Sequence, residues 1–472
     1  MDTTRTANNP FDLPELRHRL SLFIAVQDTL SCILLSKAWT HEFVSAIWFK
    51  VDFNVHPLFA DLSADIIAKH GHLIRIVENA KTPAQSSILN HANINKLRRL
   101  RMQTSELSIQ QVNAFQIVAR NNTSLRDIDF FSSTYYPNMV DKSTHHVSAS
   151  AFVPFSSATP GRLSSALESL ELTCLWLTHD ELLTILEASP RLSKLRLCHT
   201  EVVNTPTRFF QHSGITLFAA GLNQVFPKTA TTGPSLLSYF PNLTILHTWY
   251  INYNYSIATD RIKNEFARYC PLLTQFKLED VWGNIIPEFL TDIVATNVTR
   301  ITFEEDHITP ASVSAIIEHQ ATLKKVSQFN TLDFDYEDEQ VPPLYNDTDG
   351  VCVQMIELIP KKCSQLQRLN LHRHEMDMDV VESGEWPCKD LRKLRIRVKG
   401  LDTKEKILKA IALWRAGCWR RWQEQATGIK AAVEEEERLK ADQSIEARVA
   451  RHLLKFEQLW WVWLGYQTWT PI

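Results

Sequence analysis

The sequence predicts an α/β solenoid, with short parallel strands on one face and helices on the other, preceded by a short all-helical module. Three observations favour this fold class. An apolar phrase, L-x-x-L-x-L with conservative replacements, recurs many times after residue 90. Before residue 50, apolar residues recur at helical spacing instead. The chain of 472 residues is also too long for one compact core, which suits an elongated array.

Composition sets limits on partners and compartment. The formal net charge is -3, so the chain as a whole gives no reason to expect nucleic acid or an anionic membrane as a partner. No apolar run approaches the roughly 20 residues of a membrane span, and the N-terminus lacks the pattern of a secretory signal. The 8 cysteines form no C-x-x-C pair, which is typical of reduced, buried thiols. We therefore expect a cytoplasmic and/or nuclear protein.

Three helical patterns fill residues 11–52, after a polar segment, residues 1–10, that we expect to be disordered. The segment Leu13-Pro14-Glu15 places a proline in the first turn of a helix, where its missing N–H costs nothing. Asp28 is expected to be the N-cap of the second helix. A module this small normally needs a neighbour to be stable. Its apolar stripes contain Leu16, Leu20 and Phe23, then Leu30, Ile33 and Leu34, then Trp39, Phe43, Ile47 and Trp48.

The apolar phrase marks the strands of the array. Its period of two predicts a short strand with one face buried, and the residues that follow return mostly as helix, as in His179 to Ala188. Because one such unit cannot bury its apolar face alone, neighbouring units must stack. The long step from Val298 to Leu366 predicts a further, degenerate unit near Leu323-Val326. The phrases begin at Leu97, Leu125, Leu167, Leu192, Leu243, Leu273, Val298, Leu366 and Leu391.

The domain organisation follows from these patterns. Residues 97–402 are interpreted as leucine-rich repeats, interrupted by polar surface loops at 131–161 and 332–350. A strongly charged surface helix is expected over 403–447. The remaining segments are a linker and N-terminal cap at 53–96 and a C-terminal strand and cap at 448–472.

The tryptophans of the last segment allow two interpretations. The alternation of Phe456, Leu459, Trp461 and Trp463 predicts a terminal strand whose indoles close the core, with Trp460 facing the opposite way. Alternatively, the exposed indole is an aromatic anchor for a partner.

The N-terminal patterns also resemble a known module. Leu13-Pro14-Glu15, Asp28-Thr29-Leu30, Ser36-Lys37-Ala38-Trp39 and Ile47-Trp48 resemble an F-box in order and spacing. With the repeats, the chain resembles the F-box/leucine-rich repeat proteins, particularly the fungal F-box-like group. The resemblance implies a non-enzymatic substrate receptor of a Skp–cullin–F-box ubiquitin ligase, whose F-box binds the Skp adaptor and through it a cullin.

The resemblance also implies which residues contact the adaptor. In the family, a leucine-proline start and the apolar helices bind the adaptor, while the tryptophans combine internal packing with interface contact. The competing interpretation is a small helical cap, which would leave a leucine-rich repeat interaction scaffold that recruits no ligase. The residues that match are Leu13, Pro14, Leu16, Leu20, Leu30, Leu34, Trp39 and Trp48.

The strand face of the array is expected to bind an unidentified target protein. Outward positions alternate with the buried leucines, and they are basic at both ends of the array. Such a face could bind an acidic or phosphorylated segment, or it could be a solvated polar face balanced by acids elsewhere. The predicted target-binding residues are Arg99, Arg101, Lys194, Arg196, His247, Trp249, Lys393, Arg395 and Arg397.

Enzyme chemistry finds little support in the sequence. The phosphate-binding, metalloprotease and nucleophile-elbow motifs are absent from it, and its 12 glycines are few for phosphate-cradling loops. His372 and His374 near Cys388 lack further ligands at a suitable spacing for a metal. We therefore expect no catalytic residue, metal or cofactor.

Overall fold

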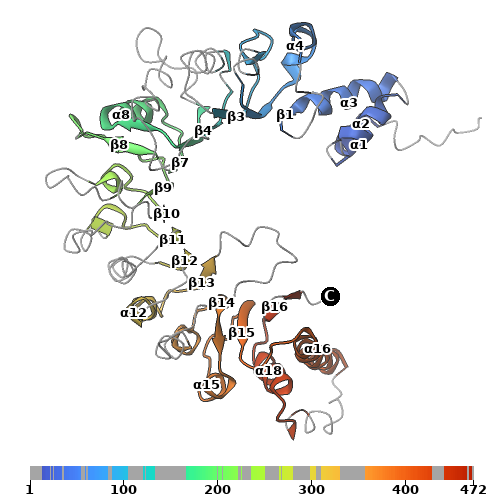
Figure 1. Cartoon of the computed structure of the whole chain (residues 1–472), viewed down its shortest axis with the longest axis vertical. Helices are drawn as coiled ribbons and strands as arrows, with labels where there is room; N and C mark the ends of the chain where they lie inside the picture. The colour runs from blue at the N-terminus through green and yellow to red at the C-terminus, as the bar shows by residue number, and fades with distance from the viewer. Residues whose placement is uncertain are drawn as a thin grey trace, which may run out of the picture. The chain divides into compact units, whose positions relative to one another are not determined.

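The computed structural model forms two compact units, Met1–Ala220 and Gly221–Ile472 (Figure 1). Each unit is a mixed α/β structure with a long run of parallel strands, which confirms the predicted fold class at that level. The structure describes residues 13–21, 23–24, 26–34, 37–54, 59, 62–82, 85, 88–104, 118, 121–122, 124–132, 166–198, 200–204, 206–221, 225, 235–249, 265–266, 268–279, 298–304, 310–329, 357–427, 439, 441–464 and 467–469.

The first unit begins with three helices at the predicted positions, α1 (Pro14–Ser21), α2 (Val26–Ile33) and α3 (Lys37–Phe49). Asp28 lies inside the first turn of α2, so its prediction as the N-cap is wrong. A carboxylate in a first turn still stabilises a helix through the helix dipole. Residues 1–10 lie outside the described residues.

The strands of the first unit pair side by side and in parallel. The helix α8 (His179–Ala188) lies where the sequence predicts one, and the side chain of Thr178 caps it by accepting from Glu181 N–H. The other helical segments are α4 (Ala64–His70) and η3 (Gly71–Leu73), and a two-stranded sheet pairs β6 (Trp176–Thr178) with β8 (Glu201–Val203). The parallel strands are β1 (Lys50–Asp52), β2 (Ile76–Ala80), β3 (Arg99–Thr104), β4 (Asp127–Ser132), β5 (Ser169–Thr173), β7 (Lys194–Cys198) and β9 (Leu217–Gly221).

Two strands fall where the apolar phrase is degraded. In β2 the pairing with β3 shifts between Val77 and Ala80, and Asn79 takes a φ of 60°, so the period of two is interrupted. In β9 a buried Ala220 stands where most phrases have a large apolar residue. The segment 53–96, predicted as linker and cap, therefore contributes a strand to the sheet.

The second unit repeats the parallel arrangement, and only its last described strand pair is antiparallel. The strand β13 lies at the predicted degenerate phrase Leu323-Val326. The insertion 332–350 and all but the first two residues of 131–161 lie outside the described residues. The strands are β10 (Ile245–Trp249), β11 (Gln275–Glu279), β12 (Arg300–Glu304), β13 (Lys325–Phe329), β14 (Arg368–Met376), β15 (Lys393–Val398), β16 (Trp461–Leu464) and β17 (Gln467–Trp469).

Helices cover one side of these strands. Figure 1 shows α12 and α15 along the same side of the strands of the second unit. Buried apolar side chains fill the space between strands and helices, which leaves the other strand face for polar residues. The helical segments of this unit are η6 (Leu236–Tyr239), α12 (Pro310–Glu318), α14 (Leu358–Lys362), α15 (Met378–Glu382), α16 (Lys404–Thr427) and α18 (Ile445–Leu453).

The region 403–447 does not form the single helix that the sequence predicts. The helix α16 is described as far as Thr427, and residues 442–444 are not helical. The second helix, α18, begins at Ile445 with the Ser444 side chain accepting from Ala447 N–H at 3.3 Å. Among the described residues of this region, the non-helical segment 442–444 separates α16 from α18, and these two helices pack on each other.

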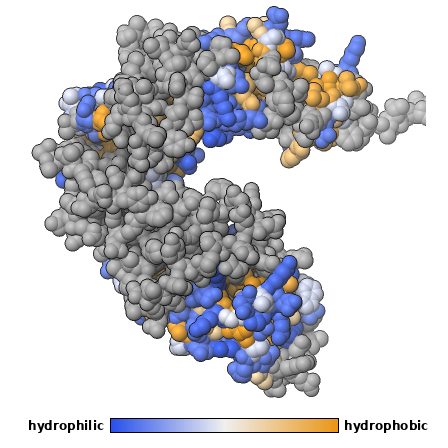
Figure 2. Space-filling model, in the orientation of Figure 1, coloured by the Kyte–Doolittle hydropathy of each residue, from blue (hydrophilic) through white to orange (hydrophobic). Residues whose placement is uncertain are grey.

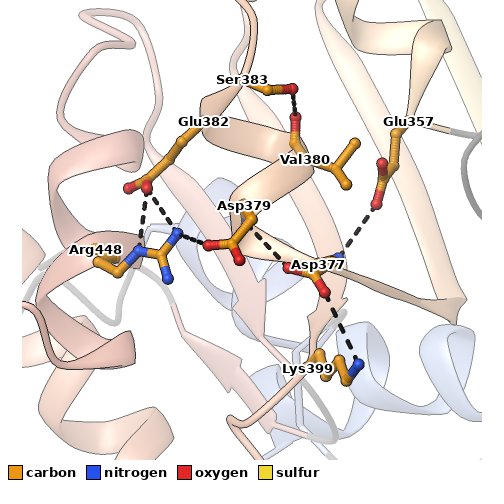
Figure 3. A network of polar contacts seen from close by, with 8 residues as sticks. All are labelled: Glu357, Asp377, Asp379, Val380, Glu382, Ser383, Lys399 and Arg448. Carbon is orange, nitrogen blue, oxygen red and sulfur yellow. Dashed lines mark hydrogen bonds and ion pairs between the residues drawn. The ribbon is translucent and has the colours of Figure 1, made fainter.

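A polar network attaches α18 to α15 (Figure 3). The Arg448 guanidinium donates to Glu382 Oε2 at 2.8 Å and to Asp379 Oδ1 at 2.5 Å. At the start of α15, Asp377 caps the helix by accepting from Asp379 N–H, and Lys399 lies 3.8 Å from Asp377. Every acid in this network thus has a structural partner, so the network holds the C-terminal helices in place.

In each unit, one apolar side chain from each parallel strand of the long sheet joins a continuous buried row. These side chains face one another in register and are at most 6% exposed. In the first unit the row is Val51, Val77, Leu100, Ile128, Leu170, Leu195 and Phe218; in the second it is Leu246, Phe276, Ile301, Val326, Leu369, Leu394 and Val462.

Removing one member of the buried row should weaken the whole unit. Leu369→Ala leaves a cavity between neighbouring strands, and we expect it to lower the free energy of unfolding by about 2–5 kcal/mol. Leu272→Ala, at a leucine that is 52% exposed, should change it by less than about 0.5 kcal/mol. Urea unfolding followed by circular dichroism measures both, and equal effects would contradict this account of the core.

Candidate functional site

The helices α1 and α2 expose apolar residues and bury polar ones. Leu13, Leu16 and Leu30 are between 39% and 52% exposed, and Leu34 and Phe23 are each 86% exposed. The side chains turned inward include Arg17, Ser21 and Thr29, all buried. Figure 2 shows hydrophobic residues on the surface of these N-terminal helices. This reverses the usual amphipathic order, and an apolar surface of this kind is typical of a protein interaction site.

The remaining residues predicted to contact the adaptor have mixed environments. Leu20 is half-buried, and the side chain of Pro14 lies outside the described residues. Trp39 stacks on Phe43 with ring centroids 5.1 Å apart. Trp48 stacks on His70 of α4 at 5.0 Å. Both half-buried indoles therefore pack within the unit, and Trp48 attaches the three helices to α4.

The strand face of the first unit carries alternating charges in ion pairs. Arg101 Nε lies 2.9 Å from Asp129 Oδ2, and Lys50 Nζ lies 2.7 Å from Glu78 Oε2. Longer contacts of 3.8 Å join Arg99 to Glu78, Arg196 to Glu171 and Lys50 to Asp52. Four cations thus face four carboxylates: Lys50, Arg99, Arg101 and Arg196 against Asp52, Glu78, Asp129 and Glu171.

The expected basic bias at this end of the array is therefore wrong. Arg99, Arg101 and Arg196 pair with acids on adjacent strands, which sequence order alone does not bring together. Lys194 is exposed, in register with Ser169 and Leu217. Burial and the nearby Glu171 raise the pKa of Asp129 to about 6, so this carboxylate is still ionised at pH 7.

The strand face of the second unit is different, because four cations stand in one register row. Arg300, Lys325, Arg368 and Lys393 are successive partners on β12, β13, β14 and β15, and we call them the cationic row. Arg300 donates to Gln275 Oε1 at 3.3 Å. Among the described residues, no carboxylate forms an ion pair with Lys325 or Arg368.

The cations of this row repel one another. Burial, followed by the charges of Arg300, Arg368, Lys393 and Lys277, lowers the pKa of Lys325 from 10.5 to about 8. Burial and Arg368 likewise lower the pKa of Arg300. The free protein thus holds a concentration of positive charge that an anion would relieve.

Two tryptophans border the cationic row on β16. Val462 and Leu464 are buried, so Trp461 and Trp463 lie on the opposite, half-exposed face, and the prediction that they close the core is wrong. Leu459, Val462 and Leu464 are the true apolar phrase of this strand. Lys393 lies over the Trp461 ring at 5.8 Å, and Arg395 lies over the Trp463 ring at 3.6 Å.

Not every predicted target-binding residue is accessible. Trp249 is 4% exposed, and its ring meets His247 edge to face at 5.6 Å, so it packs rather than presents a contact surface. Arg397 is also buried, near the end of β15 where it pairs with Glu375 in register. His247, Lys393 and Arg395 are half-exposed.

Sequence reasoning missed Arg300, Lys325 and Arg368. The signal was present, because each of these residues occupies the third position of its phrase, as Lys393 does. Comparing that one position across successive phrases shows four consecutive cations. The phrase containing Lys325 is degenerate, and a step of 43 residues separates Lys325 from Arg368, which hid the run.

A second exposed aromatic surface lies on α16. Trp419 and Trp422 are both exposed and stack with centroids 5.0 Å apart, whereas Trp414 is buried. Arg421 donates a hydrogen bond to the carbonyl of Leu454, which joins α16 to the end of α18. This arginine therefore has a structural role.

The described residues contain no group of three or more His, Cys, Asp or Glu side chains placed to hold a metal ion. In the same residues, no helix has both the length and the apolar character needed to cross a membrane. The side chains of His372 and His374 lie outside the described residues. No protein-family model matches the chain, and no curated protein matches it either.

The lowered pKa of Lys325 predicts a pH-dependent contribution to stability. Because the folded pKa lies below the unfolded value, the protonated lysine is destabilising below pH 8, and stability is gained as pH rises from about 8 to 10.5. Lys325→Gln should therefore stabilise the protein at pH 7, by up to about 1 kcal/mol after solvent screening. Most of this advantage should be lost at pH 10.

Urea unfolding at the two pH values tests this expectation. Lys324→Gln, at an exposed neighbour, is the matched control and should show no such pH-dependent difference. A Lys325→Gln effect that is the same at pH 7 and pH 10 would contradict the proposed crowding of charges.

Proposed function

We propose that this protein is the substrate-recognition adaptor of a Skp–cullin–F-box ubiquitin ligase. In this proposal the N-terminal helices are an F-box that binds the Skp adaptor, and the strand–helix units are leucine-rich repeats whose strand face binds a target protein. The observation that carries the proposal is the reversed helix surface, where α1 and α2 expose leucines and bury Arg17, Ser21 and Thr29.

The reversed surface requires a partner for a physical reason. Exposed leucines gain about 1.5–3 kcal/mol each when they move fully from water into an apolar contact. A folded domain normally obtains this stabilisation internally, by turning such residues toward its own core. Here Leu13, Leu16, Leu30 and Leu34 remain available, and they match the positions that the F-box resemblance assigns to the adaptor.

The attachment of this module supports a rigid link to the sheet. The helix α3 runs directly into β1, the first described strand, without an intervening linker. Trp48 of α3 also stacks on His70 of α4, the helix that follows β1, so α3 packs against this helix. A receptor built in this way would hold the adaptor-binding helices firmly against the sheet of the first unit.

Such a receptor needs no catalytic residue of its own. It raises the effective concentration of a target lysine near the ubiquitin-charged enzyme that the ligase recruits. This agrees with a site made of apolar and charged surfaces. The remaining strand face, with the cationic row of the second unit, is the surface we assign to the target.

Adaptor capture tests the proposal directly. The full-length chain should retain a purified Skp adaptor in a pull-down, and Leu30→Asp/Leu34→Asp should reduce that capture at least tenfold, because two charges would enter the apolar contact. Leu272→Asp places a charge at a similarly exposed leucine in the second unit and should leave capture unchanged. Unchanged thermal unfolding of the double variant shows that its fold is intact.

The outcomes separate the two candidate functions. Capture by the wild type and its loss in the double variant support a ligase receptor. No capture by the folded wild type would contradict it, and would favour a leucine-rich repeat scaffold that recruits no ligase. Capture that survives the double variant would show that α1 and α2 are not the contact surface.

A further inference from the structure

We propose that the cationic row binds a phosphorylated, extended segment of the captured protein, with one apolar side chain of that segment placed against Trp461 and Trp463. The description of the ligand as a target rests on the proposed function, whereas the binding chemistry rests on the geometry of the second unit. The row consists of Arg300, Lys325, Arg368 and Lys393, in register on four adjacent parallel strands.

The spacing of the row suits an extended peptide lying across the strands. Neighbouring strands lie about 4.8 Å apart, so four successive positions span about 14 Å. An extended peptide rises about 3.3 Å per residue and therefore crosses the row in four to five residues. Its alternate side chains would point toward the row, so only two or three of them can reach it.

This limit favours phosphate over carboxylate. Two or three carboxylates bring a charge of at most about -3, while a phosphorylated side chain alone carries about -1.5 to -2 at pH 7. One phosphate beside one or two carboxylates therefore matches four cations. The guanidinium groups of Arg300 and Arg368 can each bind phosphate oxygens with two parallel hydrogen bonds, and Lys325 between them adds a point charge.

The next register row is neutral at its centre and cationic at both ends. Thr302, Ser327 and Asn370 are successive partners on β12, β13 and β14. Thr302 and Ser327 are buried, and the row ends in Lys277 on β11 and Arg395 on β15. The cations of the two rows lie on the adjacent strands β11 to β15. A patch of this length suits a short anionic segment better than a nucleic-acid backbone, which needs an extended basic surface.

The tryptophans define one end of the band. Trp461 is the register partner of Lys393, and Trp463 is the partner of Arg395. Cations already lie over both rings, and the two ring centroids are 6.0 Å apart. A side chain of the ligand that reaches this end meets half-exposed indole surface, which favours an apolar residue there.

The first unit provides an internal comparison. Its strand face also carries arginines in register positions, but Arg99, Arg101 and Arg196 contact carboxylates of neighbouring strands. Those pairs already satisfy the charge, so a phosphate gains less there. Arginines on the two strand faces thus differ in their expected ligands, because those of the first unit already contact carboxylates on neighbouring strands.

Peptide arrays and fluorescence anisotropy with the full-length protein test the proposal. The probe is a fluorescein-labelled peptide library with a fixed central phosphothreonine, and the reference is the same library with threonine. The phosphorylated library should bind at least tenfold more tightly at 50 mM salt, and affinity should fall as salt increases. Arg300→Gln/Arg368→Gln should remove this preference, and arrays of the wild type should select an apolar residue on one side of the phosphothreonine.

Matched variants keep the result interpretable. Arg99→Gln/Arg196→Gln removes the same charge from the strand face of the first unit and should leave binding within about twofold. Lys325→Gln/Lys393→Gln is a second test of the row, in case the arginine variant unfolds. None of these variants should reduce capture of the Skp adaptor, so loss of peptide binding is distinguishable from failure of the proposed function.

Several outcomes would overturn the proposal. Equal affinity for the phosphorylated and unphosphorylated libraries, or binding that survives both row variants, would exclude a phosphate site at the row. Competition by inorganic phosphate as strong as that by the phosphopeptides would indicate a free-ion site. Tighter binding of single-stranded RNA would indicate a nucleic-acid surface, and tighter binding of an unphosphorylated peptide of residues 333–339 would indicate an internal acidic segment as the occupant.

Discussion

The buried row of apolar side chains, one from each parallel strand, is the constraint on which the rest of this structure depends. A short strand with one apolar face cannot bury that face alone, so each strand requires its neighbours in register. Leu369 lies between Val326 and Leu394 in register. This register also determines which side chains of neighbouring strands lie beside each other at every other position. The packing of the buried row sets the strand register, and the register determines which polar residues are neighbours on the opposite face.

The two units show what this constraint does to charge. In the first unit it places arginines beside carboxylates, and the face becomes neutral through pairs such as Arg101 with Asp129. In the second unit the same packing aligns Arg300, Lys325, Arg368 and Lys393, and the lowered pKa of Lys325 reflects burial and this crowding. Repulsion among these cations reduces stability, which the buried row can tolerate because it contributes much more. An anionic ligand would offset this repulsion and restore the lost stability.

The N-terminal helices present the complementary case of an apolar surface. They keep leucines in water and place Arg17 and Ser21 inside, while the stacking of Trp48 on His70 joins α3 to α4. The proposed division of roles follows from this difference. Apolar contact suits a permanent partner such as an adaptor, whereas a charged strand face suits a partner whose binding depends on modification and ionic strength.

The sequence by itself determined the α/β class, the positions of most strands and the helix α8, because these depend on periods that are visible within about ten residues. It also located β13 from the degenerate phrase at Leu323. Only the tertiary structure decided which cations lie together, since Lys325 and Arg368 are 43 residues apart and meet through strand register. Burial of Trp249 and Arg397, and the outward face of Trp461 and Trp463, likewise depend on neighbouring strands. A local period defines the two faces of a strand, but packing alone selects which face is buried and what lies beside it.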